Sequence, residues 1–240
     1  WITVPWAMAT KACDRTALTE QSSRQFVLPQ AAWIAWAAWA ALVALSILAA
    51  AMPARAGMID ESGLQPWENC ALCHSLDGVS RMAKFPKLAA QVPAYIEKQI
   101  HDFREGRRTN DGEQMQAMAG LIAEKDIPIV AKYFGGLPPP PPAEMPPPAE
   151  AELGASLFLK GDPARDLPAC VSCHGKDKVA SSGAARLEAQ HADYVIKQVT
   201  DFRSGARAND PKGVMSAVAA KLTDADIRAV GGFIAAQERK

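Results

Sequence analysis

The sequence predicts an all-α protein built from two tandem copies of one small helical domain, and three observations support this. A Cys-x-x-Cys-His motif occurs at residues 70–74 and again at residues 170–174, 100 positions later. Residues 87–111 align without a gap with residues 186–210, and 13 of these 25 positions are identical. About one or two identities would be expected by chance at average composition. Beyond residue 56, apolar residues follow helical spacing, and no segment has the alternating pattern of a strand.

Residues 1–56 differ in composition from the rest of the chain. No charged residue lies between Arg24 and Arg55, and Ala31 to Met52 is almost wholly apolar. The stretch ends in Ala54-Arg55-Ala56, a small-residue pattern typical of signal-peptide cleavage. A segment of this length could also span a bilayer as a retained anchor. Either interpretation predicts a periplasmic location, and a retained anchor also predicts membrane association.

The predicted first domain covers residues 57–137. A short helix over residues 61–72 leads into the first motif, and residues 93–104 have the apolar spacing of an amphipathic helix. A closing helix is predicted over residues 126–134. Pro128 is tolerated there because the first turn of a helix needs no N–H donor.

A proline-rich linker over residues 138–149 separates the two predicted domains. It holds eight prolines in eleven residues, which predicts a semi-rigid polyproline II spacer. The second domain, residues 150–240, repeats the order of the first. Its helices are predicted over residues 150–160, 193–203 and 224–237, the last with Thr223 as N-cap.

The two motifs have the residues that c-type haem attachment requires. Two thiols three positions apart can add to the two vinyl groups of haem, and the histidine that follows can bind the iron. A zinc site would need four ligands at compact spacing, and a thioredoxin-like dithiol would need a βαβ context. Four of the five cysteines lie in the two motifs, and the fifth, Cys13, lies in the N-terminal segment. No pair of cysteines therefore remains for a structural disulfide in the folded region. The sequence therefore predicts two covalently bound haem c groups, attached through Cys70, Cys73, Cys170 and Cys173, with His74 and His174 as iron ligands.

The sixth iron ligand decides the kind of function. A methionine thioether suits an electron carrier, whereas an open site would suit oxygen or peroxide. Met215 is the one methionine after Cys170, and it lies 41 residues after His174. Met115 lies 41 residues after His74, whereas its rival Met118 corresponds to a valine in the second copy. The predicted axial pairs are His74 with Met115 and His174 with Met215.

These features together resemble the cytochrome c4 family. The resemblance rests on the paired motifs, the Asp-Phe-Arg-x-Gly-x-Arg-x-Asn-Asp stretches that begin at Asp102 and Asp201, and the methionine before each closing helix. It covers residues 57–240. It implies two class-I cytochrome c domains related by a pseudo-twofold axis, with the haem groups near the domain interface. It also implies electron transfer in the periplasm from a bc1-type complex to a terminal cytochrome oxidase.

The charged residues do not support one class of function and leave the role of the repeated arginines open. The chain has 26 basic and 26 acidic residues, which gives no support for nucleic-acid binding. The repeated arginines have two interpretations. They could lie near haem propionates or the domain interface, where guanidinium pairing is useful, or they could be solvated cations at a helix end. These arginines are Arg104, Arg107, Arg203 and Arg207.

The leading hypothesis is an electron carrier with two His/Met haem groups, rather than an enzyme. One alternative is the cytochrome subunit of a flavocytochrome complex such as a sulfide dehydrogenase, which is also duplicated. Another is a two-haem peroxidase, which would need one open or displaceable ligand position, although both copies offer a methionine.

Overall fold

The computed structural model describes residues 63–239, which belong to one compact unit. The described residues contain helices and loops but no strand beyond one isolated bridge between Asp162 and Leu167. The predicted all-α class is therefore confirmed. None of the helices described is long and apolar enough to cross a membrane. The predicted signal peptide or anchor lies outside the described residues.

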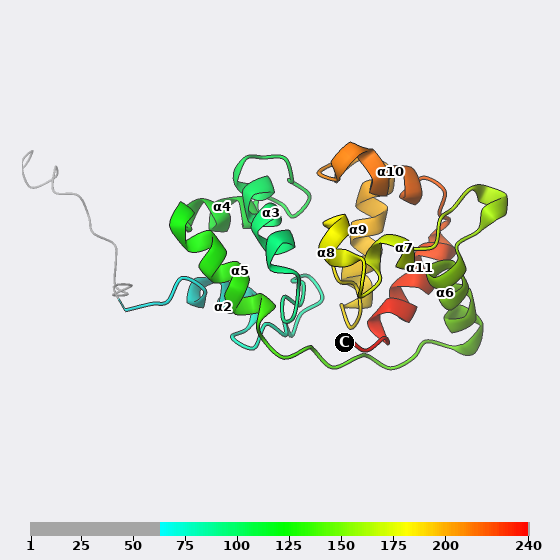
Figure 1. Ribbon diagram of the computed structural model, residues 1–240, viewed down its shortest axis with the longest axis horizontal. Helices are drawn as coiled ribbons and strands as arrows, with labels where there is room; N and C mark the ends of the chain where they lie inside the picture. The colour runs from blue at the N-terminus through cyan, green and yellow to red at the C-terminus, as the bar shows by residue number, and fades with distance from the viewer. Residues whose placement is uncertain (1–62, 240) are drawn as a thin grey trace, which may run out of the picture. The chain divides into compact units, whose positions relative to one another are not determined.

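The first half is built around α3, which packs against α4 and α5 (Figure 1). A buried apolar cluster lies between these helices, with Phe103 from α3 and Phe134 from α5 among its largest side chains. The ring of Trp67 stacks on that of Tyr133, with centroids 4.3 Å apart, and this contact holds the motif helix α2 against α5. The helices of this half are α2 (Glu68–His74), α3 (Pro93–Arg104), α4 (Gln114–Leu121), the 3₁₀ turn η1 (Glu124–Asp126) and α5 (Ile127–Gly135).

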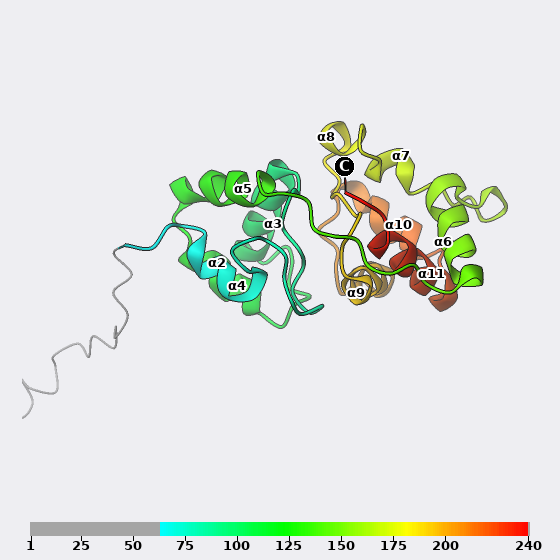
Figure 2. The ribbon, with the colours of Figure 1, turned by 90° about the horizontal axis from the view of Figure 1, so that it is seen from below.

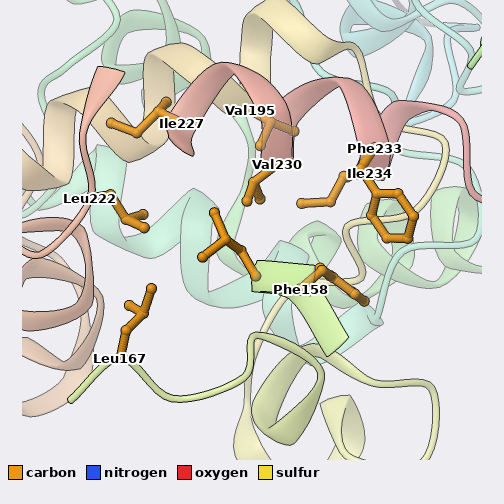
Figure 3. Packing of buried hydrophobic residues seen from close by; sticks show 9 residues of the cluster. Phe158, Leu167, Val195, Leu222, Ile227, Val230, Phe233 and Ile234 are labelled. Carbon is orange, nitrogen blue, oxygen red and sulfur yellow. The ribbon is translucent and has the colours of Figure 1, made fainter. Parts of the chain in front are cut away.

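The second half is built around α11, which packs against α6 and α9 (Figure 1). Figure 3 shows its core, where Phe158 from α6, Val195 from α9 and Val230 from α11 belong to one cluster. The helices of this half are α6 (Pro148–Lys160), η2 (Pro163–Arg165), α7 (Val171–His174), α8 (Val179–Ser182), α9 (Ala192–Ser204), η3 (Pro211–Gly213), α10 (Val214–Ala219) and α11 (Asp224–Ala235).

Most predicted helices are present, and the differences have local causes. Helix α3 has the predicted bounds, and Thr223 caps α11 in a capping box with Asp226. Helix α2 begins only at Glu68 but continues through the motif to His74. The helices that carry the methionines, α4 and α10, were not predicted, because eight and six residues are too few for a clear periodic pattern.

The linker lies against the second half rather than projecting as a free spacer. Figure 2 follows it from the end of α5, alongside α11, to the start of α6. The Ala143 N–H donates to the carbonyl oxygen of Ala235 at 2.8 Å, and Pro140 is buried. A Cβ placed on Gly232 would meet the Cγ of Pro146 at 3.1 Å. The linker is thus packed along α11, and the domain boundaries at residues 137 and 150 stay predictions.

Candidate cofactor sites

The first motif forms the helix α2 and buries its histidine. His74 is 4% exposed, and its Nδ1 lies 2.9 Å from the carbonyl oxygen of Pro86. The ring of Phe85 meets the imidazole edge-on, with centroids 6.1 Å apart. Leu72, between the two cysteines, points to solvent with 82% of its surface exposed. The helix therefore places the histidine inside the fold and Leu72 outside.

The second motif, on α7, holds its histidine by the same kind of contact, although the surface of His174 is half-buried rather than buried. The Nδ1 atom of His174 lies 2.8 Å from the carbonyl oxygen of Ala185. Ala185 occupies the place in the second copy that Pro86 has in the first, since each directly precedes the aligned repeat. Two separate stretches of chain thus orient the two histidines in one way.

These two contacts fix the tautomer of both histidines. A carbonyl oxygen can only accept, so Nδ1 carries the proton and Nε2 keeps its lone pair. Burial lowers the pKa of His74 and of His174, which favours the neutral imidazole that a metal needs. A histidine held by a backbone carbonyl with Nε2 free is the arrangement that metal-ligating histidines use. The donor set therefore fits an iron ligand at each motif.

The four motif cysteines are unpaired thiols, as attachment to haem requires. Cys70 packs against the first apolar cluster and Cys170 against the second. Burial raises the pKa of each of these two thiols to about 11. Cys73 is half-buried and Cys173 is exposed. In the part of the chain that the structure describes, no three His, Cys, Asp or Glu side chains are grouped to hold a metal.

The predicted methionine ligands lie on the short helices α4 and α10. Met115 is half-buried against the same cluster that Cys70 contacts, so the structure brings these two predicted site residues to one core. Met215 is half-buried on α10, which packs against α9. Aspartates hold both helix starts: Asp111 accepts the N–H of Met115, and Asp210 accepts the N–H of Ser216 at 3.0 Å.

Two of the repeated arginines hold the far end of these methionine helices. The Nε atom of Arg104 donates to the carbonyl oxygen of Ala119 at 3.1 Å, and its Nη1 pairs with Glu124 at 2.5 Å. In the second half, the Nη1 atom of Arg203 donates to the Leu222 carbonyl at 3.1 Å. These arginines satisfy carbonyl groups at or after the helix ends, which otherwise lack partners. Neither reaches the interface between the halves through these contacts.

A second arginine pair forms that interface. The Nη2 atom of Arg108 donates to the Tyr194 hydroxyl at 3.0 Å, and that of Arg207 donates to the Tyr95 hydroxyl at 3.1 Å. Each guanidinium also donates to Gln99 and Gln198, one glutamine from each half. Both arginines are 5% exposed.

The same reciprocity extends outward from these arginines. The Asn110 side chain donates to Asp201 at 2.5 Å, and that of Asn209 donates to Asp102 at 2.6 Å. Such paired contacts, i to j and j to i, are typical of an interface with twofold symmetry. We call this set the seam: Tyr95, Gln99, Asp102, Arg108, Asn110, Tyr194, Gln198, Asp201, Arg207 and Asn209.

The seam corrects one residue of the sequence analysis and settles the question of the arginines. Arg108, not Arg107, is the counterpart of Arg207, as the gapless alignment of the two copies indicates. Arg107 is half-exposed and pairs with Asp102. Arg207 lies at the interface, whereas Arg104 and Arg203 lie at helix ends, so each of the two interpretations holds for some of the arginines.

Comparisons with known proteins agree with this geometry. No family model matches the chain. Cytochrome c4 from Thiocapsa roseopersicina is 41% identical over 168 residues, which cover 69% of this chain and 85% of the relative. The crystal structure of reduced recombinant cytochrome c4 from Pseudomonas stutzeri matches with a TM-score of 0.63 at 35% identity, over 70% of this chain and 93% of that chain. The chain belongs to the cytochrome c4 family. This cytochrome is a dihaem c-type electron carrier with two covalently bound haem groups.

Other relatives have names that refer to sulfur metabolism. The thiosulfate dehydrogenase electron acceptor of Thiomonas intermedia is 34% identical over 172 residues, which cover 70% of this cytochrome and 78% of the relative. The cytochrome subunit of sulfide dehydrogenase from Chlorobaculum tepidum is 33% identical over 90 residues, 37% of this cytochrome and 77% of the relative.

Proposed function

We propose that this cytochrome holds its haem groups through the residues predicted from the repeated motifs. Cys70 and Cys73 attach one group and Cys170 and Cys173 the other. The iron ligands are His74 with Met115 and His174 with Met215. The observation that carries the proposal is the duplicated histidine geometry, in which a backbone carbonyl holds Nδ1 and leaves Nε2 available.

The haem iron supplies the one-electron chemistry, and the protein sets its environment. The carbonyls of Pro86 and Ala185 hold the histidines in one tautomer and orientation. Asp111 and Asp210 fix the start of each methionine helix. A ligand set that does not rearrange between redox states keeps the reorganisation small, which suits a carrier.

The methionine assignment is tested by separate substitution of each ligand. Met115→Ala and Met215→Ala should each remove, for one haem, the absorption band that reports sulfur ligation of ferric iron. Each should also lower one reduction potential, because thioether ligation raises it. Met118→Val is the matched control, since valine stands at position 218. An unchanged spectrum in Met115→Ala with a changed one in Met118→Val would overturn the assignment in the first half.

We further propose that the chain works in the periplasm and carries electrons from a bc1-type complex to a terminal cytochrome oxidase. The domains would be residues 57–137 and 150–240, joined by the linker at 138–149 and preceded by a signal peptide or anchor at 1–56. Membership of the cytochrome c4 family supports this route. Reduction of the oxidised protein by the isolated bc1-type complex, followed by oxidase turnover, would test it. Failure of either step would contradict it.

A second candidate donor is a sulfur-oxidising dehydrogenase. The similarity to a thiosulfate dehydrogenase electron acceptor over 70% of the chain favours it. The similarity to a sulfide dehydrogenase subunit, over 37% of the chain, supports the flavocytochrome alternative less. Stopped-flow reduction of this cytochrome by a thiosulfate dehydrogenase and by a bc1-type complex, under matched conditions, distinguishes the donors.

A further inference from the structure

One cation at the interface between the halves breaks its twofold symmetry. Arg239, close to the C-terminus, is 3% exposed. Its Nε donates to the carbonyl oxygen of Glu188 at 2.9 Å, and its Nη1 donates to that of Ala89 at 2.5 Å. It therefore joins the second half to the first. The corresponding position in the first copy falls in the linker, at Pro139 or Pro140, so this arginine has no counterpart.

Arg239 is incompletely satisfied within the described chain. Its Nη2 atom is buried and has no hydrogen-bond partner among residues 63–239. An arginine guanidinium has five N–H groups and no acceptor, so Nη2 has two N–H groups that need an anion or carbonyl oxygen. A buried donor without a partner is destabilising, and more so when it is charged. The position therefore indicates an acceptor that the described side chains do not supply.

A second buried cation, Lys87, lies near Arg239. Lys87 is 8% exposed, and its Nζ donates to one acceptor, the carbonyl oxygen of Ala189, at 2.8 Å. Neither Lys87 nor Arg239 forms an ion pair with a carboxylate of residues 63–239. Burial lowers the pKa of both groups; for Arg239 it falls to about 10, although the nearby Glu188 carboxylate raises it. Two buried cations without a direct ion pair to a carboxylate of the described residues are unusual, and they require a compensating negative charge.

Both cations lie next to the chain segments that orient the predicted iron ligands. Lys87 directly follows Pro86, whose carbonyl holds His74. Glu188, whose carbonyl accepts from Arg239, comes three residues after Ala185, whose carbonyl holds His174. The carbonyls that hold the two motif histidines therefore lie one residue from Lys87 and three residues from Glu188, the contact of Arg239. Haem has two carboxylate side chains, which are ionised at neutral pH.

We propose that Arg239 and Lys87 bind a haem carboxylate at the interface between the halves. The inference rests on the haem attachment proposed above. Nη2 of Arg239 and the free N–H groups of Lys87 are the donors, and a charge-assisted hydrogen bond between them and a carboxylate is about twice as strong as a neutral one. Because Arg239 occurs in one half only, the site makes the two haem environments unequal within a duplicated fold.

The site has a redox consequence with a definite sign. An ionised carboxylate stabilises ferric iron relative to ferrous iron, because reduction removes one positive charge. A guanidinium that neutralises the carboxylate offsets this and raises the potential. Loss of Arg239 should therefore lower the potential of the haem whose carboxylate it binds, and leave the other nearly unchanged.

The test is a spectroelectrochemical titration of the full-length holoprotein carrying Arg239→Gln. One of the two one-electron steps should move to lower potential, and the resonance Raman bending band of a haem carboxylate side chain should shift. Arg239→Lys, which keeps the charge, should restore most of the potential. Arg228→Gln on the exposed face of α11 is the matched control and should change neither measurement. Lys87→Gln should shift the same step in the same direction, and provides a second variant if Arg239→Gln does not fold.

Three outcomes would overturn the proposal. Unchanged potentials and an unchanged Raman band in folded Arg239→Gln, with two haem groups confirmed by intact mass, would contradict the carboxylate site alone. A wild-type potential that depends on phosphate concentration, with that dependence lost in Arg239→Gln, would show that a free anion occupies the site. An intact mass without two haem groups in the wild type would instead contradict the proposed attachment.

Discussion

The two halves of this cytochrome share their buried chemistry and differ on the surface. Around both motifs and both methionine helices, equivalent residues lie 100 positions apart. Leu72, Leu76 and Leu121 are exposed in the first half, by 82%, 56% and 76%. The corresponding residues of the second half are Ser172, Lys176 and Lys221. The two copies therefore share the residues proposed to hold the cofactor and differ in these surface residues.

We expect from this difference that the halves favour different partner surfaces, mainly through Lys176, since Lys221 is half-buried and paired with Asp166. Exposed leucines beside a redox site favour an apolar contact, whereas lysines favour a partner with a negative surface and accelerate association at low salt. Buried groups have less freedom to change, because each is fixed by several neighbours. The seam shows this constraint. Arg108 donates to Tyr194 and Gln198 of the other half, and Arg207 repeats these hydrogen bonds to Tyr95 and Gln99.

The largest expected effect comes from breaking the seam. Arg108→Met and Arg207→Met should each lower the free energy of unfolding by about 2–4 kcal/mol, because each leaves several buried acceptors without a donor. Urea denaturation would measure both. The twofold symmetry predicts values that agree within about 0.5 kcal/mol, and a larger difference would show that the two arginines are not equivalent.

A glycine pair should give effects of opposite sign in the two halves. A Cβ on Gly154 would lie 2.3 Å from the carbonyl oxygen of Ala229, so Gly154→Ala should separate α6 from α11 and cost about 1–3 kcal/mol. Gly120, in α4, has no atom within 4 Å of such a Cβ, and Gly120→Ala should stabilise the helix by about 0.5–1 kcal/mol. Thermal unfolding of the two variants would test this contrast.

The closing helices differ in their caps, and the difference can be transferred. Thr223→Ala removes the capping box of α11 and should cost about 1 kcal/mol. In the first half, Ala123 stands at the equivalent position, three residues before Asp126. Ala123→Thr should therefore stabilise the first half by a few tenths to about 1 kcal/mol. No gain in the free energy of unfolding would show that the 3₁₀ turn η1 prevents the cap from forming.

The capping box also makes part of the stability of the second half sensitive to acid. Burial alone would raise the pKa of Asp226, but hydrogen bonds from Arg165 and Thr223 outweigh it and lower the pKa overall. Because the folded-state pKa is depressed, this stabilisation is fully present above the unfolded pKa of about 4 and is lost as pH falls through the folded value. Asp226→Asn should therefore destabilise at pH 7 and reduce the slope of stability against pH below about 4.

The smallest effects on stability are expected at the surface. Leu72→Ser should change the free energy of unfolding by at most about 0.5 kcal/mol, since the side chain is exposed. It should still reduce retention on a hydrophobic matrix. Lys176→Gln should leave stability unchanged but weaken the salt dependence of reduction by a negatively charged donor. Equal salt dependence in the wild type and in Lys176→Gln would contradict a role for this lysine in docking.

The proposed site residues were all predicted from the sequence. The Cys-x-x-Cys-His motif is a local signal, because its chemistry needs residues adjacent in the chain. The duplication gave each position a counterpart in the other copy, and this favoured Met115 over Met118 as the predicted ligand. The apolar spacing of residues 93–104 predicted α3 with its observed bounds. Helices with strong apolar periodicity and caps, such as α11, were also predictable, because their signals lie within a few residues.

Only the tertiary structure decided which polar groups meet between the halves. Arg108 and Arg207 lie close to Gln198 and Gln99 of the other half, across about 90 to 108 residues of chain, and no local pattern reports such a pair. The same holds for Arg239, whose contact with Ala89 spans 150 residues. The sequence alone determined what each half can bind, because attachment chemistry is local. The packing of the chain decided how the two halves are joined, because burial and hydrogen-bond partners depend on the whole fold.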